Sequence, residues 1–286
     1  MSEKNKVWFI TGSSTGFGRE LAEQCLERGY KVVATARRIE DVQDLEEKYP
    51  ESALAAQLDV TKDEEVKNSV AKATEKFGTV DILVNNAGYG LGGGIEEPSM
   101  DQIRHQYETN VFGVIRVMRE VLPMMREKKS GHIVNLSSVV GIKAFASTGY
   151  YSSTKFALES LSEALSQEVE HLGIKVTLVE PGGFRTDFAG RSFTQPENRI
   201  EDYITSERID AIGEYHNNQP GDPVKGAKAM IDMVEAENPP LRLPLGEDAV
   251  TAIDEKLEAV RQDINEWREV AIDTKVDEEQ ADGVGG

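Results

Sequence analysis

The stretch "KVWFITGSSTGFG", residues 6–18, decides the fold, because a short apolar run ends there in a turn with three glycines. The run has the length and the branched and aromatic content of a buried strand, and a helical pattern follows it. Between the two, Thr11, Gly12, Gly16 and Gly18 form a T-G-x-x-x-G-x-G pattern. Glycines let such a turn tighten and let backbone amides at the helix N-terminus approach a pyrophosphate. The stretch therefore predicts a dinucleotide-binding turn.

The rest of the chain repeats this order of apolar strand and helix. The alternation indicates an α/β fold, in which a parallel sheet is covered by helices on both faces and binds ligands beyond the carboxyl ends of its strands. We expect further strands within residues 30–36, 52–60, 80–88, 131–138, 174–183 and 239–246, and helices at about 40–49, 63–77, 101–127, 150–171, 223–237 and 249–271. We expect one domain over residues 1–275 that includes a polar segment at about 186–223, and a disordered tail at 276–286.

Composition excludes several classes of protein. The formal net charge of −19 argues against binding to nucleic acid or to an anionic membrane. The single cysteine, Cys25, permits no intramolecular disulfide, and with four scattered histidines it gives no zinc ligand set, so we expect no metal. The N-terminal apolar run is too short for a signal peptide, and no stretch approaches the ~20 apolar residues that cross a bilayer. We expect a soluble, cytoplasmic protein.

The end of the second predicted strand bears on cofactor choice. An acidic residue about 20 positions after the glycines would bind a ribose hydroxyl, whereas an arginine there accommodates a 2′-phosphate. Ala36 stands near that position, followed by Arg37 and Arg38. The pair favours NADP over NAD, although Glu40 or Asp41 could neutralise it as an ordinary solvated pair.

Small and polar residues follow the other strands, as a ligand groove requires. Asp59 and Val60 end the third strand, where the carboxylate is either an acceptor for an adenine amino group or an ordinary turn residue. The fourth strand ends in "NNAG", residues 85–88, and the fifth in Ser137 and Ser138. The sixth ends in "EPGGFRT", residues 180–186.

Two neighbouring tyrosines precede a lysine in "GYYSSTKFA", residues 149–157. In a helix, Tyr151 and Lys155 lie on one face, whereas Tyr150 points elsewhere. A phenol beside a fixed ammonium can act as an acid or base, although an aromatic that packs beside a solvated lysine gives the same pattern. The spacing alone leaves both alternatives open.

The glycine turn also fits a rival motif. "GSSTG" matches the G-x-S-x-G nucleophile elbow of α/β-hydrolases, with Ser14 as nucleophile and His171 or His216 later in the chain. That alternative lacks an H-G-G-G-like oxyanion segment and leaves the other strand ends unexplained.

Taken together, these motifs resemble the short-chain dehydrogenase/reductase family over about residues 6–245. The resemblance rests on "TGSSTGFG", "NNAG", Asn110 in "YETNVFG", Ser138 in "VNLSS", "YSSTK" and "PGGFRT", with Ser138 13 residues before Tyr151. The stretch "PGGFRTDFAGRS" and the longer C-terminus are most similar to the subgroup of 17β-hydroxysteroid dehydrogenases. The resemblance implies a Rossmann-type, doubly wound, mainly parallel sheet of about seven strands with a C-terminal helical extension.

The resemblance also implies roles for residues. Tyr151 would be the acid for carbonyl reduction and the base for alcohol oxidation, with Lys155 lowering its pKa and holding the nicotinamide ribose. Ser138 would hydrogen-bond the substrate oxygen, and Asn110 would hold a water beside Lys155. The implied cofactor-binding set is Gly12, Ser14, Gly16, Phe17, Gly18, Arg37, Asp59, Val60, Asn86, Ala87, Gly88, Tyr151, Lys155, Pro181, Gly182, Phe184 and Thr186.

The implied activity is an NADP-dependent oxidoreductase, with NAD(H) as the alternative cofactor, that interconverts a small-molecule carbonyl and its alcohol. The family implies a homo-oligomer, a dimer or a tetramer. A nucleotide-binding regulator with a vestigial site is the alternative, and the presence of Asn110, Ser138, Tyr151 and Lys155 together argues against it.

Overall fold

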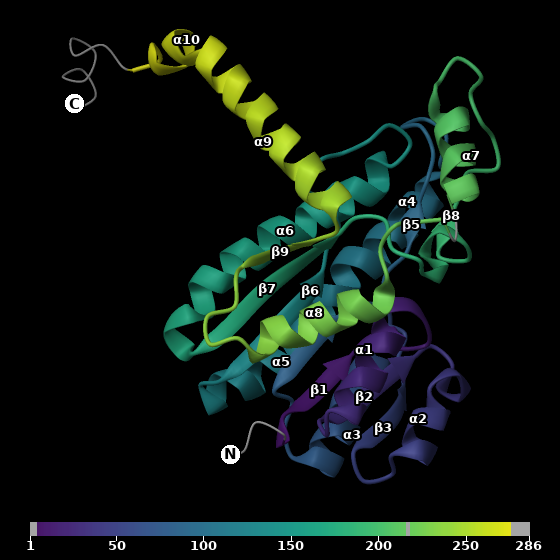
Figure 1. The fold of residues 1–286 in the computed structure, drawn as a ribbon, viewed down its shortest axis with the longest axis vertical. Coiled ribbons are helices and arrows are strands. Elements are labelled where there is room, and N and C mark those ends of the chain that lie inside the picture. Colours follow the sequence, from purple (N-terminus) through teal and green to yellow (C-terminus); the bar gives the residue numbers. More distant parts are fainter. Residues whose placement is uncertain (1–4, 216–217, 276–286) are drawn as a thin grey trace, which may run out of the picture.

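A seven-stranded parallel sheet forms the centre of the computed structural model, which describes residues 5–215 and 218–275 (Figure 1). Its strand order is β3-β2-β1-β4-β6-β7-β9. The strands are β1 (Val7–Ile10), β2 (Lys31–Ala36), β3 (Ala53–Gln57), β4 (Ile82–Asn85), β6 (Gly131–Leu136), β7 (Ile174–Pro181) and β9 (Arg242–Leu245). The chain winds outward in both directions from β1, so the predicted doubly wound fold is confirmed.

Helices cover both faces of this sheet (Figure 1). One face packs against α1 (Gly16–Glu27), α2 (Gln43–Lys48) and α8 (Pro223–Glu235), and the other against α3 (Asp63–Phe77), α5 (Val114–Lys128) and α6 (Gly149–Val169). Successive side chains of β1 alternate between the two cores: Trp8 packs on the α1 and α8 side, whereas Phe9 packs on the α3 and α5 side. Burial on both faces explains why the strands are continuously apolar.

The predicted helix at 101–127 is interrupted in the structure. It consists of α4 (Met100–Tyr107), a π-helical segment η3 (Glu108–Gly113) and α5. The Asn110 side chain in η3 donates hydrogen bonds to the Tyr89 carbonyl oxygen at 2.9 Å and to Thr154 Oγ1 at 3.2 Å. These partners lie far away in the sequence, so the helical periodicity gave no sign of the break.

A second, two-stranded parallel sheet joins the segment after β4 to the polar segment at about 186–223. It pairs β5 (Gly90–Leu91) with β8 (Phe193–Thr194). A Cβ atom at Gly90 or Gly92 would lie 2.7 Å from the Phe193 ring, so glycine is needed for this close approach. The polar segment also contains the short η6 turn (Asp187–Ala189) and α7 (Thr205–Tyr215).

The C-terminal extension consists of α9 (Glu247–Glu266) and α10 (Arg268–Ile272), which project from the body of the molecule (Figure 1). At the base of α9, Asp248 Oδ2 accepts a hydrogen bond from the Gly183 amide at 2.7 Å. The tail predicted at 276–286 lies outside the described residues. Across residues 5–215 and 218–275, no helix has the length and apolar character needed to cross a membrane.

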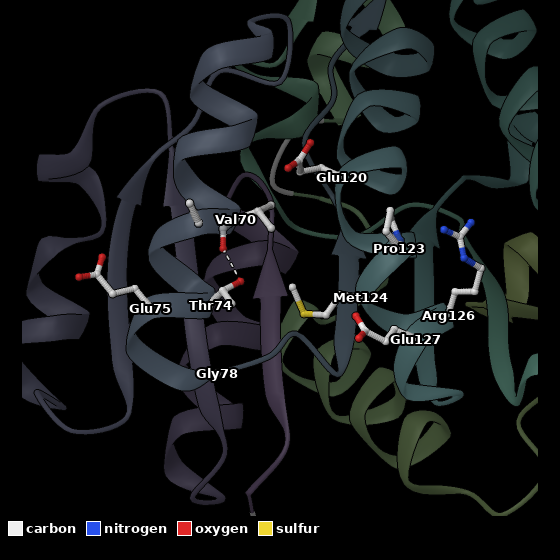
Figure 2. A pocket seen from close by; sticks show the side chains of 10 residues that line it. Val70, Thr74, Glu75, Gly78, Glu120, Pro123, Met124, Arg126 and Glu127 are labelled. Atoms are coloured by element: carbon white, nitrogen blue, oxygen red, sulfur yellow. Dashed lines mark hydrogen bonds between the residues drawn. The ribbon is translucent and has the colours of Figure 1, made fainter.

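A hollow of about 960 Å³ lies between α3 and α5 (Figure 2). It is lined by the C-terminal parts of both helices, including Gly78, Met124 and Glu127. These parts lead into β4 and β6, so the hollow is near the amino ends of the strands. It lies at the opposite edge of the sheet from the predicted site.

Candidate active site

The glycine turn after β1 is tied to the end of β4. The Asn86 side-chain amide donates to the Thr11 and Gly12 carbonyl oxygens, both at 2.9 Å. In return, Thr11 Oγ1 accepts from the Asn86 and Ala87 amides, both at 2.9 Å. Gly12 has a φ of +69°, in the left-handed region that favours glycine. The hydrogen bonds therefore fix two predicted motifs, "TGSSTGFG" and "NNAG", against each other.

Gly18 has a structural role in this turn. A Cβ atom there would lie 2.3 Å from the Gly12 carbonyl oxygen, so only glycine lets α1 pack this closely. Gly18 is buried and does not line the cavity, in contrast to Gly12 and Gly16.

A cavity of about 870 Å³ opens at the carboxyl ends of the strands. The structure gathers there Ser138 and every predicted cofactor-binding residue except Gly18. Glycines keep this space open: a Cβ at Gly12 would lie 3.0 Å from Ala87 Cα, and one at Gly16 would lie 3.3 Å from Thr186 Cβ. A space of this volume that is lined by a glycine turn and by Lys155 fits a nicotinamide dinucleotide.

The structure separates the two tyrosines. Tyr151 is buried, 7% exposed, and lines the cavity, where its ring lies 5.3 Å from that of Phe188. Tyr150 is absent from the cavity lining and donates its hydroxyl to the Ile95 carbonyl oxygen at 2.8 Å. Of these two tyrosines, Tyr151 is therefore the one placed to meet a ligand in the cavity.

Burial controls the acid–base properties of Tyr151. Burial raises the pKa of the Tyr151 phenol well above its usual value, and a hydrogen bond with the Ser138 side chain acts in the opposite direction. The sequence-based expectation that Lys155 lowers this pKa is not met in the structure without ligand. Lys155 Nζ lies 5.8 Å from the centre of the tyrosine ring and donates to the Leu136 carbonyl oxygen at 2.6 Å. The phenol therefore stays protonated at neutral pH.

Lys155 is itself buried and electrostatically tuned. Burial lowers the pKa of its ammonium group to about 8, and the negative charge of Glu159 acts to raise it. The ammonium loses its charge as the pH rises through about 8. Lys155 is thus poised to titrate close to neutrality, although a lysine in water does not.

Asn110 lies beside this group and outside the cavity lining. Its amide is engaged by Tyr89 and Thr154, and its Oδ1 accepts from the Tyr89 amide at 3.1 Å. A Cβ atom at Gly88 would lie 3.2 Å from Asn110 Oδ1 and 3.9 Å from Lys155 Nζ. The side chain therefore shapes the wall behind Gly88, and its role in holding a water stays a prediction.

The two arginines that follow β2 differ in their ionic partners. Arg38 forms an ion pair with Asp41, with Nη2 and Oδ1 2.6 Å apart. Arg37 is exposed and lines the cavity, and within the described chain it makes no ion pair. Asp59 also lines the cavity while its Oδ1 accepts from the Thr61 amide at 3.0 Å. Burial acts to raise the pKa of Asp59, yet the Thr61 hydrogen bonds hold it below its usual value.

The sequence analysis missed a buried ionic cluster one helical turn beyond Lys155. Glu159 and Glu180 are 5% and 1% exposed, and the Arg242 guanidinium binds both. Arg242 Nη2 also lies 2.9 Å from Glu163 Oε2, at the surface. Burial raises the pKa of Glu159 to about 7. The i, i+4 spacing from Lys155 was a usable sequence signal, but Arg242 comes from β9, far along the chain.

The hydrolase alternative is not supported by this geometry. Ser14 lines the cavity after β1. His171 lies in the Glu170–Leu172 turn that precedes β7, so it sits at the opposite edge of the parallel sheet. His216 lies outside the described residues. Where the chain is described, no cluster of three or more His, Cys, Asp or Glu side chains is arranged to hold a metal ion.

Comparisons with known proteins agree with this site. Residues 6–197 match the family model described as short chain dehydrogenase. "Oxidoreductase BOA17" of Botryotinia fuckeliana is 38% identical over 272 residues, covering 93% of this chain and 98% of the relative. A short-chain dehydrogenase structure from Streptomyces avermitilis has a TM-score of 0.88 at 43% identity, covering 95% of this chain and 100% of its own. The chain therefore belongs to the short-chain dehydrogenase family.

The family assignment makes the protein an NAD(P)-dependent oxidoreductase. A serine dehydrogenase structure in complex with NADP+ has a TM-score of 0.73 at 27% identity, covering 84% of this chain and 94% of its own. The Rossmann-type fold and a nicotinamide cofactor follow from these similarities. The hydrolase alternative is thereby wrong.

Proposed function

We propose that the protein interconverts a ketone or aldehyde and its alcohol with NADP(H), and that Tyr151 is the acid and base. The observation that carries the proposal is the buried Tyr151 phenol, which lines the 870 Å³ cavity beside Ser138 and Lys155. Both partners lie within the same cavity wall, so a carbonyl group there would meet a proton donor and a second hydrogen-bond donor.

The residues of the chain would divide the reaction between them. When bound, the nicotinamide supplies or accepts the hydride. The raised pKa of Tyr151 keeps its proton in place at neutral pH, so the phenol can protonate the carbonyl oxygen during reduction. Ser138 Oγ donates to the Pro181 carbonyl oxygen at 3.3 Å. With substrate bound, it would donate its hydrogen to the oxygen of the substrate carbonyl instead. Alcohol oxidation would run the same proton transfer in reverse, with the phenolate as the base.

Lys155 would act on both the cofactor and Tyr151. Below pH of about 8 its ammonium group is charged. In this form it would hold the ribose hydroxyls next to the nicotinamide and stabilise the developing phenolate. Asn110 would support this region through the wall that it shares with Gly88.

We infer a preference for NADPH over NADH from Arg37. Its guanidinium lines the cavity without a carboxylate partner in the described chain, whereas Arg38 is held by Asp41. Ala36 replaces the acid that would bind a ribose 2′-hydroxyl. A 2′-phosphate would therefore meet a cation that forms no ion pair in the described chain, although the charge of Arg37 also acts on Asp59. NADH would lack this contact and remain the weaker cofactor.

Three further proposals rest on the sequence. The similarity of the "PGGFRTDFAGRS" stretch supports membership in the subgroup of 17β-hydroxysteroid dehydrogenases. A cytoplasmic location is the second proposal, and the acidic composition is its support. The family resemblance supports a homo-oligomer built from a single domain over residues 1–275, with a lid at about 186–223.

A screen of NADPH oxidation tests this proposal. The purified protein would be offered ketones, aldehydes, quinones, steroids and sugars, with absorbance of NADPH as the readout. We expect turnover with at least one carbonyl class and none with NADPH alone. Binding of NADPH without turnover on the whole panel would instead support the regulatory alternative with a vestigial site.

A further inference from the structure

The helix α9 leaves the body of the protein with a large apolar surface uncovered. It runs for 20 residues, and of these only Ala249, at its base, is fully buried. Leu257, Ile264 and Trp267 are 57%, 54% and 65% exposed, on a helix that projects away from the sheet (Figure 1). Isolated exposed apolar residues are ordinary, but a continuous row of them indicates an interaction surface.

The apolar residues follow the spacing of a coiled coil. Intervals of three and four residues alternate along the whole helix, which is the a and d pattern of a heptad repeat. Six residues occupy alternating a and d positions, beginning with a: Val250, Ile253, Leu257, Val260, Ile264 and Trp267. A helix that packs only on its own domain needs a broader, less regular stripe. The narrow seam therefore points to a second helix as its partner.

The charges beside this seam are complementary to those of a second, antiparallel copy. When Val250 faces Trp267 of the other copy, a twofold axis crosses the middle of the helix. Two pairs of flanking positions within α9 then bring opposite charges together. They are Asp254 with Arg261, and Lys256 with Asp263. A parallel arrangement would bring Lys256 beside Arg261 of the other copy, which is repulsive.

These flanking charges are not used within one chain. Lys256, Arg261 and Asp254 make no ion pair inside the part of the chain that the structure describes. The ion pair that α9 does make, from Glu255 to Lys143 at 2.6 Å, anchors the helix base on a side away from the seam. Most of the seam is therefore available to a partner, and so are Asp254, Arg261 and Asp263, whereas Ile253 and Lys256 are half-buried near the helix base.

We propose that α9 pairs in antiparallel orientation with α9 of a second copy of this chain, along the seam from Val250 to Trp267. A membrane surface is a poorer occupant, because α9 carries seven acidic residues against two basic ones. Anionic lipid would repel such a helix. The self-complementary charge pattern selects a second copy of the same chain over an unrelated helix.

Light scattering coupled to size exclusion tests the contact. One chain has a mass of 31.6 kDa, so the wild-type protein should elute with at least twice that mass. The double variant Leu257→Glu/Ile264→Glu should halve the wild-type mass. The control Ala259→Glu/Gln262→Glu adds the same charge on the outer face of α9 and should keep the wild-type mass. All four positions are exposed, so circular dichroism should show intact folding.

Disulfide trapping tests the orientation. In the antiparallel register, Ile253 of one copy faces Ile264 of the other, whereas two Ile253 residues lie about 16 Å apart. A disulfide needs Cα atoms within about 7 Å. A mixture of Ile253→Cys and Ile264→Cys proteins should therefore give a crosslinked dimer on oxidation, and either variant alone should not. The native Cys25 is buried and does not interfere.

Three results would overturn the proposal. The wild-type protein could have the mass of one chain. If that single chain also bound phosphatidylcholine vesicles, the occupant of the seam would be a lipid surface instead of a second copy. The Leu257→Glu/Ile264→Glu variant could retain the wild-type mass. Efficient crosslinking of Ile253→Cys alone would show a parallel pair and refute the antiparallel register.

Discussion

The cofactor preference of this enzyme should depend on one exposed guanidinium group. We predict that Arg37→Ala raises the Michaelis constant for NADPH and leaves that for NADH nearly unchanged. A hydrogen bond to a charged group contributes about 1.5–3 kcal/mol, and about 1.4 kcal/mol corresponds to a tenfold change. Because Arg37 is exposed, solvent screening places its contribution at the lower end of this range. The NADPH-to-NADH selectivity should therefore fall about tenfold.

Arg38 provides the matched control for this measurement. It is the adjacent arginine on the same strand end, but its guanidinium is bound to Asp41 at 2.6 and 3.1 Å. Steady-state kinetics with one carbonyl substrate and both cofactors would compare the two alanine variants. Arg38→Ala should leave the selectivity within a few-fold of wild type. An equal rise in both Michaelis constants for Arg37→Ala would refute the assignment, as would a larger selectivity loss for Arg38→Ala.

Two further predictions follow from buried groups. Above pH of about 7, Glu159 is ionised and raises the pKa of Lys155, so Glu159→Gln should shift the loss of NADPH affinity to lower pH. Fluorescence titration of NADPH at a series of pH values through about 8 measures the pH midpoint of this loss of affinity. The control Glu163→Gln, at the surface of the same cluster, should leave that midpoint unchanged. An unchanged midpoint for Glu159→Gln would show that its charge does not reach Lys155. Gly18→Ala should destabilise the fold by about 1–3 kcal/mol in urea unfolding, because its Cβ would meet a backbone oxygen at 2.3 Å. Gly213→Ala has open space around it, and equal losses for both variants would contradict this packing argument.

The order of strands and helices could be predicted because the chain encodes it locally. Buried parallel strands are continuously apolar, and the residues after each strand end face a common edge of the sheet. That rule predicts that Gly12, Arg37, Asn86 and Ser138, each of which follows a different strand, lie around one ligand site. All four line one cavity at the carboxyl ends of the strands, and their binding of a ligand there stays a prediction.

The features that escaped prediction depend on contacts between distant residues. The break at Asn110 depends on Tyr89 and Thr154, which helical periodicity does not report. The pairing of Gly90 with Phe193 joins segments about a hundred residues apart through two residues each. The raised pKa of Tyr151 comes from burial, whereas the i, i+4 spacing suggested only the effect of its lysine neighbour. Local patterns cannot supply such information.

The two neighbouring tyrosines offer the most direct test of the central claim. Tyr151→Phe keeps the ring and removes the proton of the buried phenol, whereas Tyr150→Phe removes a hydroxyl that binds the Ile95 carbonyl oxygen. Turnover of both variants would be measured with one carbonyl substrate, and NADPH binding by fluorescence. We predict a fall in turnover of about 10²–10⁴-fold for Tyr151→Phe, with NADPH affinity retained, and a change within a few-fold for Tyr150→Phe. Near-normal turnover by Tyr151→Phe, or inactivity of Tyr150→Phe alone, would contradict the assignment of Tyr151 as the acid and base.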